Sequence, residues 1–163
     1  MPTVSNTSPI LNLAIIGRLS LLRQQFGEVI IPKAVLEECR IDENLLGTEE
    51  ISAAIREGWL SVREISKKDE AVLLERELDK GESEAIALAL ELNADLVLID
   101  ERDARRICQS IDMKVTGVRG ILARAYKDKQ LPSLEDAFFQ LKENAGFYIK
   151  DDLVKHILRA TEG

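Results

Sequence analysis

The chain has 163 residues, of which 45% are hydrophobic and 4% aromatic, and its 22 basic against 29 acidic side chains give a net charge of −7. This length predicts one domain over residues 1–163, and the acidic balance argues against a broad basic surface for nucleic acid while leaving room for a local one. Because no apolar run approaches the ~20 residues that span a membrane and the start lacks a secretion signal, we expect a cytoplasmic protein without membrane contact.

Strands and helices alternate along the chain. A strand over residues 3–6 leads to Ser8 and Pro9, which predict a helix that Ser8 caps and Gly17 ends. Further strands are predicted at residues 29–31, 60–65, 96–99 and 114–116. Helices are predicted to start near residues 9, 19, 33, 48, 69, 80, 103, 117, 133 and 151. This alternation predicts a three-layer α/β/α fold around a parallel sheet of about four or five strands.

The stretch from Leu96 to Asp100 is an apolar run that ends in acids. Its four apolar residues predict a buried parallel strand, and ligands of open α/β sheets lie at the carboxyl ends of strands. Asp100 is therefore expected in a cleft, where a carboxylate binds a metal, acts as a base or is neutralised by a partner. Asp103 either faces the same cleft or is a charge favoured at a helix N-terminus. Glu101 is expected to point outward.

Two further helices carry candidate acids. The segment 81–85 (GESEA) places two acids in the first turn of an apolar helix. Glu82 has capping-box spacing from Asp79, so Glu84 is favoured as the functional acid, with Glu82 as the alternative. Glu38 lies late in the helix that Pro32 opens, where the helix dipole disfavours a carboxylate; it is either solvated or functional.

Four segments, in this order and spacing, resemble the PIN-domain family, in particular its small stand-alone prokaryotic members. They are VSNTSP at 4–9, IPKAVLEE at 31–38, GESEA at 81–85 and LIDERD at 98–103. The resemblance extends over nearly the whole chain. It implies a small α/β/α fold with a parallel sheet, acids that bind Mg²⁺ or Mn²⁺, and metal-dependent hydrolysis of RNA phosphodiesters, often as the toxin of a toxin–antitoxin pair.

The resemblance also implies a set of metal ligands. The family's acids fall on Glu38, Glu84 and Asp100, which would form the catalytic set, and Asp103 matches a further acid of many members. The family's first acid falls on Asn6, which offers a carbonyl oxygen but no charge. Losing that charge should weaken metal binding, so the residue leaves open whether the protein still cuts RNA.

Other residues are expected near the RNA. The family's hydroxyl-bearing position after its first acid falls on Thr7 or Ser8. Phosphate contacts on this acidic chain are expected from arginines, with solvated helix charges as the alternative reading: Arg102, Arg105, Arg106 and Arg119.

The alternative function is a catalytically weak or inactive PIN-like module that binds RNA or a protein partner. The neutral Asn6 favours this alternative, and the three retained acids disfavour it. Phe147 and Tyr148 are expected to pack in the core or at an interface, where a homodimer contact or an antitoxin protein would lie.

Overall fold

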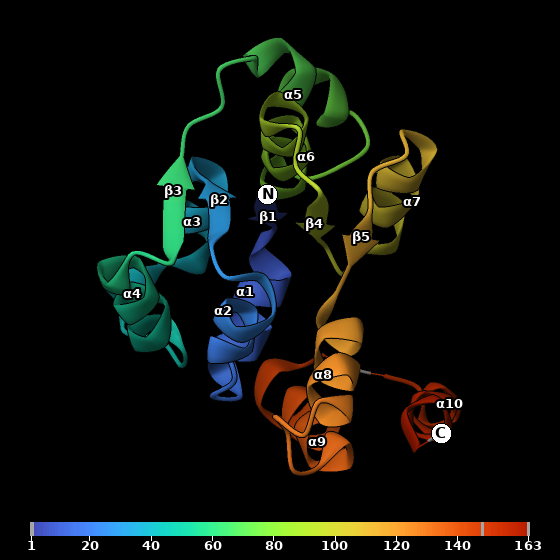
Figure 1. The fold of residues 1–163 in the computed structure, drawn as a ribbon. Coiled ribbons are helices and arrows are strands. Elements are labelled where there is room, and N and C mark those ends of the chain that lie inside the picture. The colour runs from blue at the N-terminus through green and yellow to red at the C-terminus, as the bar shows by residue number, and fades with distance from the viewer. Residues whose placement is uncertain (1, 148, 163) are drawn as a thin grey trace.

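A parallel sheet forms the centre of the molecule (Figure 1). The computed structural model describes residues 2–147 and 149–162, and within them the sheet has five strands in the order β3-β2-β1-β4-β5. All four neighbouring pairs are parallel. The strands are β1 (Thr3–Ser5), β2 (Val29–Pro32), β3 (Leu60–Arg63), β4 (Leu96–Leu98) and β5 (Val115–Thr116). The predicted α/β class, with its parallel sheet of four or five strands, is confirmed.

Helices connect the strands and continue beyond the last one. Those before β4 are α1 (Thr7–Ile15), α2 (Ser20–Phe26), α3 (Lys33–Cys39), α4 (Thr48–Glu57), α5 (Lys68–Leu74) and α6 (Lys80–Leu92), with a 3₁₀ turn at Ile41–Glu43. Those after β4 are α7 (Arg102–Ser110), α8 (Val118–Lys127), α9 (Leu134–Ala145) and α10 (Asp151–Glu162). No helix in the described part of the chain is long and apolar enough to cross a membrane.

The alternation of side chains along each strand divides the core into two layers. Val97 and Ile99 face one side of the sheet and pack with buried residues of α6 and α7. Leu98, between them, packs on the other side with residues of α1, α2, α8 and α9. Both faces of the central strands are thus covered, as parallel sheets require. At the two edges, α4 lies beside β3 and α7 beside β5 (Figure 1).

The junction between β1 and α1 corrects the prediction about which residue caps the helix. The backbone N–H of Asn6 still donates to the carbonyl of Leu98 at 2.9 Å, and Thr7 begins α1. Asn6 therefore holds the N-cap position and Ser8 lies inside the helix, so the prediction that Ser8 caps it is wrong. Pro9 stays in the first turn, where the missing N–H has no intrahelical partner to lose.

Candidate functional site

A cavity of about 610 Å³ opens where β1 and β4 end and α1 begins. Because all strands are parallel, their carboxyl ends share one edge of the sheet, the usual place for ligands in such folds. We call this space the acidic cavity. It is lined by Asn6, Thr7, Ser8, Leu11, Asn12, Glu38, Asp79, Glu82, Asp100, Glu101 and Phe147.

Two hydrogen-bond donors hold the carboxylate of Asp100 at this edge of the sheet. Its Oδ2 accepts from Ser8 Oγ at 2.7 Å, and its Oδ1 accepts from the backbone N–H of Val118 at 2.7 Å. Asn12 Nδ2 in turn donates to Ser8 Oγ at 2.9 Å, so the hydroxyl is oriented toward the carboxylate. A Cβ on Gly117 would overlap Asp100 Oδ1, so a larger residue there would displace the carboxylate. The carboxylate is thereby fixed in one orientation.

Burial raises the pKa of Asp100 above its ordinary value. The Val118 N–H and the Ser8 hydroxyl oppose this rise, and so do the charges of Arg119 and Arg105. Desolvation prevails because these contacts compensate only part of the cost of burying the ionised carboxylate. A cation at the site would lower this pKa and keep Asp100 ionised.

Glu38 reaches the same cavity from the end of α3. Its Oε2 accepts from Thr7 Oγ1 at 2.7 Å, and its carboxylate lies directly over Gly81, at a place where a Cβ would overlap it. The hydroxyls of Thr7 and Ser8, adjacent in sequence, therefore orient two carboxylates that come from different parts of the chain.

Glu82 is the third carboxylate of the cavity. It is 6% exposed and forms a complete capping box: its Oε1 accepts from the Asp79 N–H at 3.1 Å, and Asp79 Oδ1 accepts from the Glu82 N–H at 2.8 Å. Burial raises the pKa of Glu82 to about 7, and the charges of Asp79 and Glu101 act in the same direction. The predicted capping role is confirmed, and the side chain also faces the candidate site.

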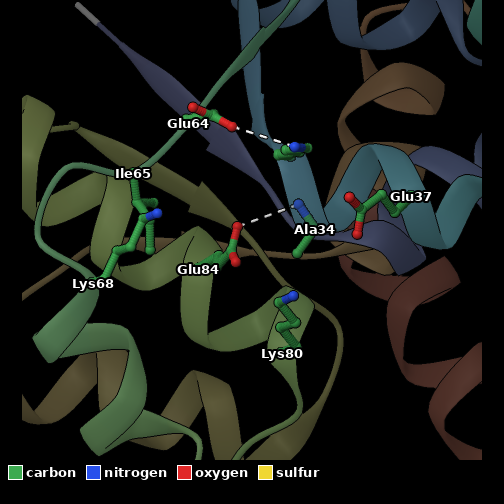
Figure 2. A pocket seen from close by; sticks show the side chains of 8 residues that line it. Ala34, Glu37, Glu64, Ile65, Lys68, Lys80 and Glu84 are labelled. Carbon is green, nitrogen blue, oxygen red and sulfur yellow. Dashed lines mark hydrogen bonds and ion pairs between the residues drawn. The ribbon is translucent and has the colours of Figure 1, made fainter.

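The structure brings Glu82, rather than the favoured Glu84, to the acidic cavity. Two positions along a helix differ by about 200° around its axis, so the two side chains leave α6 on nearly opposite sides. Glu84 lines a separate pocket of about 190 Å³, where it accepts from the Ala34 N–H at 3.2 Å (Figure 2). Lys33, Lys68 and Lys80 surround it there. Glu84 thus supplies the acceptor that Pro32, at the N-cap of α3, lacks.

Asn6 lies where the family resemblance places an acid. It is 5% exposed, and its Oδ1 is buried without a hydrogen-bond partner among the described residues. A buried acceptor of this kind costs free energy unless a donor or cation is supplied. The amide oxygen therefore suits a ligand in the cavity.

Two acids after β4 behave differently from each other. Asp103 is exposed, forms an ion pair with Arg106 at 3.3 Å and does not line the acidic cavity, so the structure leaves it outside the group of carboxylates. Glu101 is exposed, as expected, but lines the cavity, and its Oε2 caps α7 by accepting from the Ala104 N–H at 2.9 Å. Sequence reasoning missed this, although an acid at N-cap spacing was visible.

The arginines expected near RNA converge on a second cavity. It measures about 540 Å³ and is lined by Asp100, Arg102, Arg105, Arg106, Gln109 and Arg119. We call it the arginine pocket. Asp100 lines both cavities, so they adjoin at this residue.

The residues of the acidic cavity fit a hard divalent cation. Carboxylate and amide oxygens are the ligands that Mg²⁺ and Mn²⁺ prefer, and Asn6 Oδ1 is a buried oxygen in need of a partner. Among the described residues, no three side chains of His, Cys, Asp or Glu lie close enough to hold one ion together. A cation here would use few carboxylates and several waters, which is the usual mode for Mg²⁺.

Phe147 lines the acidic cavity with its half-buried ring and also packs against the core. Tyr148, the other half of the expected dimer or antitoxin contact, lies outside the described residues.

One comparison with known proteins gave a match, and it agrees with this architecture. Neither the curated proteins nor the solved structures gave a match. A family model described as PIN domain matches residues 2–163, and such domains have a nuclease-type fold that typically uses divalent metals. Since the match covers nearly the whole sequence, the chain belongs to the PIN-domain family.

Proposed function

We propose that this protein is an endoribonuclease that hydrolyses RNA phosphodiester bonds at the acidic cavity with the help of Mg²⁺ or Mn²⁺. One observation carries the proposal: Glu38, Glu82 and Asp100, from three separate segments, line one cavity at the carboxyl edge of the sheet together with the amide oxygen of Asn6. A bound divalent cation would neutralise phosphate oxygens and lower the pKa of a bound water.

The residues of the chain have distinct parts in this proposal. Asp100 and Glu38 are the ligands held by the Ser8 and Thr7 hydroxyls. Glu82, whose pKa lies near neutrality, ionises when a cation is present and is protonated more readily without one. Local fixation matters because a carboxylate that is already oriented loses little conformational freedom when it binds.

Cleavage of a labelled single-stranded RNA in the presence of MnCl₂ tests the proposal. Asp100→Asn and Glu82→Gln are expected to reduce the rate by about 100-fold or more, as losses of catalytic electrostatic groups do. Glu84→Gln should retain activity within a few fold, and so should the control Glu57→Gln, an exposed residue of α4 paired with Arg23 at 3.5 Å. Loss of activity in Glu84→Gln with none in Glu82→Gln would reverse the assignment.

A second candidate is a PIN-like module that binds RNA or protein without cutting, and the neutral Asn6 favours it. The same assay separates the two candidates. If the wild-type protein cuts none of several structured and unstructured RNAs with either metal, the module is the better description.

The toxin role is a further part of the proposal and rests on the family alone. Induced expression in a bacterial host should arrest growth, and Asp100→Asn should relieve the arrest. Normal growth on wild-type expression would remove the support for a toxin and for an antitoxin partner. The homodimer likewise stays a prediction, which light scattering checks.

A further inference from the structure

The arginine pocket lies between α7 and α8, next to the end of β5. Three of its arginines come from α7 at positions 102, 105 and 106, and Gln109 completes the helical spacing of three, four and seven residues that defines one face. Arg119 approaches from the first turn of α8. The pocket is therefore built by two elements that are separated by a strand.

The pocket concentrates positive charge on an acidic protein. Four arginines and one carboxylate line it, whereas the chain as a whole has a net charge of −7. Arg106 pairs with Asp103 at 3.3 Å, but in the described part of the chain no acidic side chain forms an ion pair with Arg102, Arg105 or Arg119. The three guanidinium groups of the pocket that form no ion pair in the described part of the chain are suited to an anion.

The position of Asp100 says which anion fits. Asp100 lines both cavities, and the positive charges of Arg119 and Arg105 act on its carboxylate, where they oppose the rise in pKa that burial causes. A nucleic-acid strand whose scissile phosphate lies in the acidic cavity would pass its neighbouring phosphate beside Asp100 toward the arginines. Guanidinium groups bind phosphate oxygens in a bidentate manner.

We propose that the arginine pocket is a phosphate subsite, which binds the RNA phosphate next to the scissile one and so positions the strand across Asp100. This inference rests on the proposed function, because it takes the phosphate in the acidic cavity to be the one that is cleaved. The binding of phosphate in the arginine pocket does not itself depend on catalysis. Without a cation the acidic cavity repels RNA, so the arginine pocket supplies most of the affinity in EDTA.

Fluorescence anisotropy with a labelled single-stranded RNA pentanucleotide in EDTA tests the subsite. The double variant Arg105→Gln/Arg119→Gln should bind about tenfold more weakly, and its slope of log Kd against log salt should fall by about 0.7, the value for one phosphate of a single strand. The control is Arg56→Gln, an exposed arginine of α4 that pairs with Glu49 at 3.1 Å. It changes the charge without touching the pocket, and its affinity should stay within about twofold of wild type.

A chemical counterpart makes the test specific to one phosphate. A neutral methylphosphonate linkage is placed at each position of the pentanucleotide in turn. At one position it should weaken binding to the wild type but not to the double variant. Equal losses in both proteins at every position would overturn the subsite, and so would a double variant that binds like Arg56→Gln.

The outcomes distinguish this inference from the proposed function. If the wild type cuts no RNA but the arginine variants lose affinity in EDTA, the subsite stands and the hydrolase falls. If Asp100→Asn abolishes cleavage while the arginine variants bind and cut normally, the subsite alone is overturned. Tighter binding of a polyglutamate peptide than of RNA, lost in the same variants, would overturn it in favour of an acidic protein segment.

Discussion

Replacing Glu82 by glutamine should stabilise the metal-free protein at alkaline pH and leave it unchanged in acid. Burial raises the pKa of Glu82 from its ordinary 4.5 to about 7 in the folded state. The folded state thus holds this proton more tightly than the unfolded state, and the resulting stability is complete below about pH 4.5 and lost as pH rises through about 7. Each tenfold difference in proton affinity corresponds to about 1.4 kcal/mol, so the free energy of unfolding falls by about 3 kcal/mol over this pH range.

Glutamine keeps the shape and the acceptor of the capping box but cannot ionise. Urea unfolding in EDTA at pH 5 and pH 8 should therefore show Glu82→Gln gaining about 3 kcal/mol over wild type at pH 8 and little at pH 5. Glu75→Gln, an exposed residue after α5, is the control and should change neither value. A gain of the same size at both pH values, or none at pH 8, would refute the reasoning from burial.

Three other substitutions or reagents probe the same cavity and core. Gly81→Ala should change the free energy of unfolding by less than about 1 kcal/mol, because alanine favours the helix, yet weaken Mn²⁺ binding in calorimetry by displacing Glu38; unchanged binding would contradict the contact. Asn6→Asp introduces a buried charge, so it should lower the free energy of unfolding in EDTA by about 2 kcal/mol and increase the stabilisation that MnCl₂ produces. A variant that is as stable as the wild type in EDTA would count against burial of this side chain. Burial raises the thiol pKa of Cys39 to about 12 and of Cys108 to about 11, so both should react with a disulfide reagent at pH 8 only after denaturation, and rapid labelling of the native protein would argue otherwise.

The sheet could be predicted from the sequence because each strand is a local signal. Apolar runs mark β2 and β4, an alternation of apolar and polar residues marks β3, and a valine beside hydroxyl-bearing residues marks β1 and β5. The run ending at Asp100 even indicated the edge where the cavity lies. The spacing of arginines along α7 was equally local. These features depend on neighbours within one element, so they are readable without the fold.

The choice between Glu82 and Glu84 could not be made that way. Helix α6 is buried nearly all round, from Gly81 to Ser83 and again from Ala85 to Ala89, so its apolar residues do not define which side meets the sheet. Ser8 presents the same difficulty, since a hydroxyl near a helix start either caps that helix or binds a distant group. Both choices depend on tertiary packing, which overrides local preference.

The central place of β1 has a consequence for when the site comes into being. β4, one of the two partners of β1, follows it in the chain by about ninety residues, and the hydrogen bond from Ser8 to Asp100 spans 92 positions. Such long-range pairing forms late in folding. A nascent chain that ends before Asp100 lacks the closed cavity, so an RNA-cutting activity of the proposed kind would begin only after residue 100 had been translated.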